Sequence, residues 1–248
     1  MIREFLAAIA FLTRFPVLPD RPFNAREVAR SARWFPLVGL AIGFALLSTA
    51  RATALLFPAL VAALIVVVVH MALTGALHMD GLADMADGFG GGHSKENVLR
   101  IMRDHAIGTY GAVALILAVG VKAACIAAFI ESSRRPEHYL VLAPTLGRWS
   151  AVLMSVLQPY ARSDMEAGIS ALIGRSELMV ATVLTVTAST LLSGWSGLVV
   201  VLVATAVTIA VSVYCRYRIG GITGDTIGGN CQIVEVVTLL IGVAAVRS

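Results

Sequence analysis

Long apolar runs, separated by short polar segments, dominate the pattern of residues along this chain. A helix needs roughly 20 apolar residues to cross the hydrocarbon core of a bilayer, where it satisfies its own backbone hydrogen bonds. The first, fifth and last of the runs found here are short, which leaves the count open by one or two. The runs predict seven membrane-spanning helices, at 36–50, 52–77, 108–130, 139–160, 179–195, 196–214 and 233–246.

The segment before the first span has a different pattern. Its apolar residues Ile2, Phe5, Leu6, Ile9 and Leu12 recur at helical spacing, which predicts an amphipathic helix in the membrane interface. Of the 248 residues, 58% are hydrophobic and 14% are charged, whereas soluble domains average about 25% charged. We therefore expect an all-α, polytopic transmembrane bundle that forms a single domain over the whole chain, with its first 35 residues interfacial or cytoplasmic.

The net charge of +4 does not indicate a nucleic-acid partner, because the basic residues flank the spans instead of covering one face of a soluble domain. Lysine and arginine are enriched in cytoplasmic loops of membrane proteins. This rule places the N-terminus in the cytoplasm, together with two polar loops rich in glycine and aspartate, 78–107 and 215–232. We expect the active site in these two segments.

The first polar segment contains five of the fifteen acidic residues. On a helix, Asp84 and Asp87 lie about 40° and about 20° from Asp80, so the three carboxylates share one face. Like charges on one face repel, and each carboxylate near hydrocarbon costs roughly 2.5–3.5 kcal/mol. A divalent cation would remove both penalties, and oxygen ligands favour Mg²⁺ or Mn²⁺. The alternative is a solvated face of a cytoplasmic loop.

Glycines within 88–92 predict a flexible hinge after the aspartates, and Ser94 is suited to cap a helix over 95–105. Arg100 and Arg103 are neighbours on this helix. Two adjacent guanidinium groups suit a phosphate or diphosphate ligand, although an arginine at the interface can instead contact lipid headgroups.

The second polar segment has the sequence Gly-Gly-Ile-Thr-Gly-Asp-Thr-Ile-Gly-Gly-Asn at 220–230. Its glycines let backbone N–H groups approach a phosphate, and Asp225 adds a carboxylate; the alternative use of such glycines is in turns and close helix packing. Lys122 and Arg148 fall inside predicted spans and need an acidic partner or an anionic substrate. Arg148 is the stronger substrate candidate, whereas Lys122 has Glu235 as an alternative, structural partner.

Together, these motifs resemble those of the cobalamin synthase family, the membrane-bound adenosylcobinamide-GDP ribazoletransferases. The resemblance covers nearly the whole chain. The matching motifs are Thr13-Arg-Phe-Pro16, Phe35-Pro-Leu-Val-Gly39, His78-Met-Asp-Gly-Leu-Ala-Asp84 with Asp87-Gly88, Ile101-Met-Arg-Asp104 with Ile107-Gly108 and Tyr110-Gly111, Gly147-Arg148, and Gly221-Ile-Thr-Gly-Asp-Thr226 with Glu235.

The resemblance implies a Mg²⁺-dependent transferase of the bacterial inner membrane whose active site faces the cytoplasm. A ribose hydroxyl of α-ribazole, or of its 5′-phosphate, would attack the diphosphate of adenosylcobinamide-GDP, which gives adenosylcobalamin or its 5′-phosphate and releases GMP. The substrates and the lipid bilayer are the implied partners, and the family leaves room for homo-oligomers and for contacts with other cobalamin-assembly enzymes.

The resemblance also implies roles for individual residues, because positioning and electrostatics supply most of the catalysis of diphosphate cleavage. The expected metal ligands are Asp80, Asp84, Asp87 and Asp225. The expected catalytic residues are Asp104 and Asp225, as base or orienting group. The expected substrate-binding residues are Arg100, Arg103, Arg148, Gly221, Thr223, Gly224 and Glu235.

Three other functions fit the motifs less well. CDP-alcohol phosphotransferases carry Asp-Gly-x-x-Ala-Arg, and the segment from Asp80 to Asp84 lacks that arginine. A prenyltransferase-like enzyme would have two similar aspartate motifs, whereas the second half of this chain offers only the single aspartate of the 220–230 segment, Asp225, as a second motif. A cation transporter would have acidic residues at mid-span and an internal repeat, and the sequence shows neither.

Overall fold

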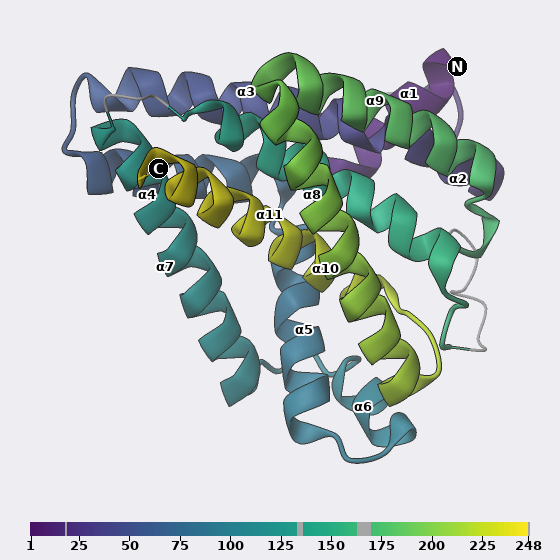
Figure 1. The fold of residues 1–248 in the computed structure, drawn as a ribbon. Coiled ribbons are helices and arrows are strands. Elements are labelled where there is room, and N and C mark those ends of the chain that lie inside the picture. The colour runs from purple at the N-terminus through teal and green to yellow at the C-terminus, as the bar shows by residue number, and fades with distance from the viewer. Residues whose placement is uncertain (18, 133–135, 163–169, 248) are drawn as a thin grey trace.

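The computed structural model describes residues 1–17, 19–132, 136–162 and 170–247. Within these ranges the regular structure is helical, apart from one isolated bridge between Tyr160 and Ile222. The expected all-α fold is therefore confirmed (Figure 1). The helices are α1 (Ile2–Leu12), α2 (Ala25–Ser31), α3 (Phe35–Ala54), α4 (Ala59–Thr74), α5 (Leu77–Gly91), α6 (Lys95–Ile101), α7 (Thr109–Glu131), α8 (His138–Leu157), α9 (Arg175–Ser193), α10 (Trp195–Ile219) and α11 (Gly224–Arg247), with 3₁₀ turns at Ala32–Trp34 and Ser170–Leu172.

Six helices of the described chain are long and apolar enough to cross a membrane, and a seventh span arises if α4 and α5 are counted as one broken span. These two helices meet at an angle of 94°. The bend occurs at Gly75 and Ala76, which both have positive φ, 62° and 57°. Glycine is the residue that most readily ends a helix in this conformation. The bend turns the carboxylate-bearing α5 away from the apolar α4.

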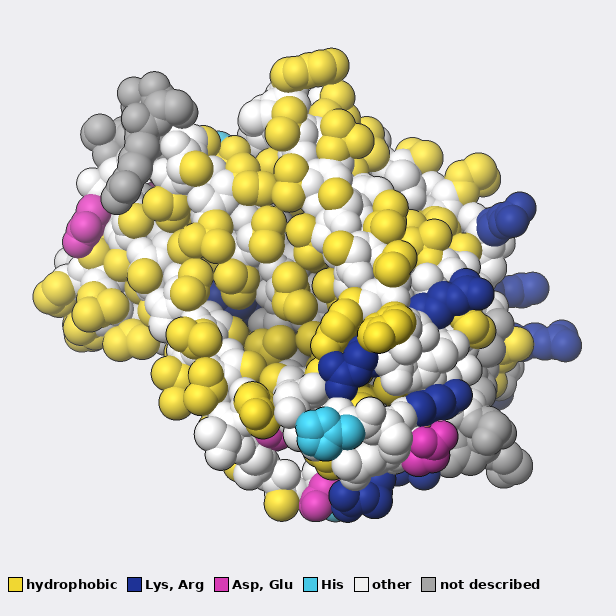
Figure 2. Space-filling model, turned by 60° about the horizontal axis from the view of Figure 1, so that its bottom comes forward, with side chains coloured by type: hydrophobic (Ala, Val, Ile, Leu, Met, Phe, Trp, Pro, Cys, Tyr) yellow, Lys and Arg dark blue, Asp and Glu magenta, His cyan; other side chains and the backbone are white. Residues whose placement is uncertain are grey.

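Helix α8 is the central helix of the bundle. In its apolar stretch 83% is buried by the rest of the protein, whereas in that of α9 22% is buried. Gly39 and Gly43 bring the backbone of α3 onto α8 beside Pro144 and Val141. Small residues allow such close approach of membrane helices. Figure 2 shows apolar side chains over much of the outer face, with charged side chains gathered to one side. Apolar helix faces that no other part of the protein covers are suited to lipid.

The polar end of the molecule is formed by α6 and by the ends of α5, α7 and α10 that surround it (Figure 1). Helix α6 begins as expected, because the Ser94 hydroxyl accepts a hydrogen bond from the Asn97 N–H at 3.2 Å. The helix ends at Ile101, four residues before the expected end at 105. The expected amphipathic helix near the N-terminus is present as α1.

Both glycine-rich segments differ from the expected loops. Helix α5 continues through Gly91, and α11 begins at Gly224 instead of 233. The glycines serve close packing between helices, which was the alternative use considered for the second segment. A Cβ on Gly229 would lie 2.6 Å from the Met85 Cε, and a Cβ on Gly88 would meet the Met102 side chain at the same distance. A helix forms at these glycines because its neighbours fill the space of the missing side chains.

Candidate active site

Two glycines allow α5 and α11 to cross almost in contact. A Cβ on Gly81 would lie 2.8 Å from the Asp225 carbonyl oxygen, and one on Gly228 would lie 3.4 Å from the Gly81 Cα. The crossing brings Asp80 and Asp84, from the first polar segment, next to Asp225 from the second. Residues more than 140 positions apart in the sequence thus line one cavity.

The backbone around Pro159 positions an arginine beside Asp225. The Ile222 N–H donates to the Pro159 carbonyl at 2.9 Å, and the Ala161 N–H donates to the Ile222 carbonyl at 2.8 Å. This short pairing holds the segment after α8 along the segment before α11. Arg162 therefore reaches Asp225 and donates from Nη2 to Oδ2 at 2.8 Å.

The start of α11 fixes the Asp225 side chain. The Thr223 hydroxyl accepts a hydrogen bond from the Thr226 N–H at 3.2 Å and donates to Asp225 Oδ2, also at 3.2 Å. The Thr226 hydroxyl accepts from the Thr223 N–H at 2.8 Å. Thr223 is fully buried, so it positions the carboxylate instead of reaching a substrate. Gly221 packs against the Pro159 backbone, whereas Gly224 borders a cavity.

Three neighbouring cavities meet at these residues. The polar cavity, of about 590 Å³, contains Asp80, Asp84, Met102, Arg103, Asp104, His105, Arg162 and Asp225. The basic cavity, of about 420 Å³, shares Arg103 and Arg162 with it and adds Lys95, Glu96, Leu99, Arg100 and Ala161. A third, largely apolar chamber of about 300 Å³ shares Asp80 and Asp225 with the polar cavity.

Asp87 lies elsewhere, although it follows Asp84 on α5. Its Oδ2 accepts a hydrogen bond from the Gly108 N–H and its Oδ1 accepts one from the Gly111 N–H, both at 2.8 Å. These N–H groups belong to the start of α7, where helices favour a negative charge. Asp87 is 8% exposed and caps α7 from a neighbouring helix. The structure does not bring it to the polar cavity with Asp80 and Asp84.

The carboxylates of the polar cavity are possible ligands of a divalent cation. Within the described ranges, no group of three or more His, Cys, Asp or Glu side chains is arranged to hold a metal ion by itself. Mg²⁺ commonly takes one or two protein carboxylates and completes its shell with water and substrate phosphates. The carboxylates of Asp80 and Asp84, which line the polar cavity, fit this mode of binding.

A separate ionic cluster lies inside the bundle. Glu235 of α11 pairs with Lys122 of α7 and Arg148 of α8, and Lys122 also donates to Gln232. Glu235 is 1% exposed and Arg148 is fully buried. The pairing of Lys122 with Glu235, which was the alternative considered for that lysine, is present. The structure does not bring Arg148 or Glu235 to the polar cavity or the basic cavity.

Comparisons with known proteins identify the family. A family model described as "Cobalamin-5-phosphate synthase" matches residues 4–243. The chain belongs to this family. It is 39% identical to the adenosylcobinamide-GDP ribazoletransferase of Syntrophobacter fumaroxidans over 243 residues, which cover 96% of this chain and 97% of the relative. The proteins of the same name from Sinorhizobium medicae and Clostridium tetani are 39% and 31% identical, over 96% and 98% of this chain and 96% and 97% of theirs. No solved structure matches the chain.

The cobalamin synthase family was therefore recognised correctly from the sequence motifs. The structure places six of the twelve expected site residues in the two cavities: Asp80, Asp84, Asp104 and Asp225 in the polar cavity, and Arg100 and Arg103 in the basic cavity. Arg162 and His105 also line the polar cavity but were not expected there. Arg162 follows Pro-Tyr-Ala, a segment without helical periodicity, so only its pairing in space identifies it.

Proposed function

We propose that the protein joins adenosylcobinamide-GDP to α-ribazole, or to its 5′-phosphate, and releases GMP, with Mg²⁺ bound at Asp80 and Asp84 and with Asp225 as the base. The observation that carries the proposal is the make-up of the polar cavity, in which carboxylates and guanidinium groups face one space. The names of the relatives describe the same transfer. CDP-alcohol phosphotransferase-like, prenyltransferase-like and transporter functions have no comparable support.

The charges around the polar cavity support a metal–diphosphate ligand. Four carboxylates and two guanidinium groups border it, so the carboxylates exceed the guanidinium groups by two negative charges. One divalent cation would neutralise them. When bound, Mg²⁺ would neutralise developing charge on the phosphate oxygens. Arg103 and Arg162 border both this cavity and the basic cavity, where guanidinium groups are suited to hold phosphates.

The chemistry requires one bond to form and one to break. The ribose hydroxyl oxygen bonds to the corrinoid-side phosphorus, the bond from that phosphorus to the bridging oxygen breaks, and GMP leaves with the bridging oxygen. A carboxylate takes the hydroxyl proton and passes it to solvent. We assign this role to Asp225, because Arg162 and Thr223 occupy its Oδ2, which leaves Oδ1 to accept the proton. Asp104, across the same cavity, is assigned to orient the phosphates.

The proposed site lies on the cytoplasmic side of the bacterial inner membrane. Four positively charged residues, Lys95, Arg100, Arg103 and Arg162, gather around the basic cavity. Membrane proteins concentrate such residues on the cytoplasmic side. GMP and the phosphate-bearing substrate would then be exchanged with the compartment that supplies nucleotides.

The test uses purified protein in detergent with adenosylcobinamide-GDP, α-ribazole 5′-phosphate and Mg²⁺. Asp84→Asn is expected to lower the rate by about two orders of magnitude or more, as the loss of a single group that stabilises transition-state charge does elsewhere. Chelation of Mg²⁺ should abolish product formation. Asp20→Asn is the matched control, since the Asp20 side chain is 79% exposed near the N-terminus. A native protein that forms no GMP at any Mg²⁺ concentration would contradict the proposed function.

A further inference from the structure

The third cavity, the apolar chamber, has no part in the chemistry described so far. Its lining is mostly apolar and includes Phe11, Phe35, Ile173 and Ile227. We propose that this chamber binds the flat, apolar base of the nucleoside substrate, so that Phe11 and Phe35 form a stacking platform for the benzimidazole ring of α-ribazole. The inference rests on the proposed function and deepens it.

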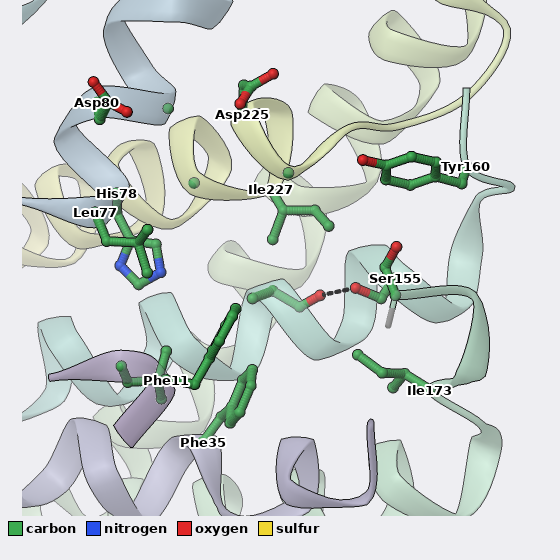
Figure 3. A pocket seen from close by; sticks show the side chains of 16 residues that line it. Phe11, Phe35, Leu77, His78, Asp80, Ser155, Tyr160, Ile173, Asp225 and Ile227 are labelled. Atoms are coloured by element: carbon green, nitrogen blue, oxygen red, sulfur yellow. Dashed lines mark hydrogen bonds between the residues drawn. The ribbon is translucent and has the colours of Figure 1, made fainter. Parts of the chain in front are cut away.

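The geometry of the chamber has two distinct sides. Figure 3 shows Asp80 and Asp225 along one side and the rings of Phe11 and Phe35 on the opposite side. The two rings are stacked, with centroids 5.7 Å apart and planes 11° from parallel. Phe35 is buried, whereas Phe11 is 45% exposed and adjoins the empty space. A third flat ring, that of the ligand, can therefore extend this stack.

The polar groups of the chamber discriminate between the rings of the two substrates. The polar side chains of the lining are Asp80, Asp225, His78, Tyr160, Ser155 and Ser170, and the Ser155 hydroxyl already donates to the Ala151 carbonyl of its own helix at 2.8 Å. Guanine carries several hydrogen-bonding groups on its edges, and the wall formed by Phe11, Phe35 and Ile173 would leave those that face it unsatisfied at a high cost. A benzimidazole ring has no N–H once it is joined to ribose, and its carbon edge suits Ile173 and Ile227. The corrin ring, with its rim of side chains, is several times larger and does not fit about 300 Å³.

The shared residues connect this chamber to the chemistry. Asp80 and Asp225 border both the apolar chamber and the polar cavity. A base held in the chamber would place its ribose between these carboxylates, and the diphosphate would lie beyond them, against Arg103 and Arg162. The hydroxyl then meets Asp225 and the phosphorus together, which is the positioning that a transfer reaction needs.

The experiment measures the KM for each substrate separately. Phe11→Ala is expected to raise the KM for α-ribazole by roughly 5- to 150-fold, the range found when an aromatic residue that stacks on a nucleic-acid base is removed. The KM for adenosylcobinamide-GDP should remain within about twofold of the native value. The matched control is Phe44→Ala, because Phe44 is 46% exposed, lies on α3 and does not line the chamber.

A second variant fills the chamber instead of opening it. Ser155→Phe places a ring in the space that the base would occupy, and it should weaken binding of α-ribazole measured by calorimetry without the second substrate. Free 5,6-dimethylbenzimidazole should compete with α-ribazole and not with adenosylcobinamide-GDP. Thermal unfolding of each variant, together with its KM for adenosylcobinamide-GDP, shows whether the protein is folded.

The outcomes separate this inference from the proposed function. If the native protein makes product but both folded variants leave the affinity for α-ribazole unchanged, the chamber does not bind the base. The inference is likewise overturned if only the KM for adenosylcobinamide-GDP rises, or if the variants alter only the response to added lipid. If the native protein makes no product, the proposed function fails. Calorimetry with α-ribazole alone still decides the inference in that case, because absent binding overturns it.

Discussion

Asp87 provides the sharpest test of how the carboxylates of α5 divide their roles. Its two oxygens accept hydrogen bonds from the N–H groups of Gly108 and Gly111 at the start of α7. Replacing Asp87 with Asn keeps the shape and one acceptor oxygen but turns an NH₂ group toward one of these donors. We therefore expect Asp87→Asn to destabilise the protein while the polar cavity keeps its Asp80 and Asp84.

The magnitude follows from the contacts. A buried hydrogen bond to a charged group is worth about 1.5–3 kcal/mol, and the interaction with the helix dipole adds about 0.3–1 kcal/mol. The loss is thus roughly 2–4 kcal/mol for Asp87→Asn. At about 2–4 °C per kcal/mol for a chain of this length, the midpoint of thermal unfolding should fall by roughly 4–16 °C.

The assay combines thermal unfolding in detergent with the Mg²⁺ dependence of the rate below the unfolding temperature. For Asp87→Asn, the Mg²⁺ concentration at half-maximal rate should match that of the native protein. Asp84→Asn should behave in the opposite way, with an unchanged melting temperature and a higher Mg²⁺ requirement. An Asp87→Asn protein that melts normally and needs as much Mg²⁺ as Asp84→Asn would show that Asp87 is a metal ligand and that the capping argument is wrong.

Two further pairs of substitutions test the close contact between α5 and α11 and the buried ionic cluster. Gly81→Ala should lower kcat by at least tenfold, because its Cβ would lie 2.8 Å from the Asp225 carbonyl oxygen and would push α11 away. Gly120→Ala is the control and should leave kcat unchanged, because a Cβ there meets nothing within 4 Å. Glu235→Gln should lower the unfolding free energy by about 3–5 kcal/mol, since it leaves two buried cations without a counter-charge. Lys122→Met should lower the unfolding free energy by less in the same assay, because the ion pair between Arg148 and Glu235 survives. If Glu235→Gln and Lys122→Met lowered the unfolding free energy equally, Glu235 would not be the shared counter-charge of the two cations.

The apolar pattern was enough to predict the helical architecture, because the length of a membrane helix depends on the bilayer and each span satisfies its own hydrogen bonds. The helix α1 was predicted from the spacing of Ile2, Phe5 and Leu12. The cap at Ser94 was predicted from residue type alone, since the interaction is local.

The glycine-rich segments show where such reasoning fails. Local propensity favours a hinge or loop at Gly88 and Gly224, yet both belong to helices. The compensation comes from distant residues such as Met102, which packs against Gly88. Tertiary contacts of this kind leave no periodic signal near the glycine, so the helix boundaries could not be predicted from the sequence.

The division among the three aspartates of α5 could not be predicted for a related reason. Helical geometry predicts Asp80, Asp84 and Asp87 on one side of the helix, but it does not say what each meets. The start of α7 meets Asp87, whereas α11 meets the other two near Asp225. The position of Arg162 depends in the same way on a backbone pairing between distant segments.

The space beside the charged groups distinguishes the two polar sites of the protein. Glu235 has a cation on each carboxylate oxygen, Lys122 on one and Arg148 on the other, and it borders a hollow of about 20 Å³. This cluster carries one net positive charge, but a hollow of this size has no room for a substrate, so its side chains contribute to stability. The polar cavity has an excess of carboxylates and about 590 Å³ of space. A cation can enter this space and balance the negative charges, so substitutions there should change activity and metal requirement before they change the melting temperature.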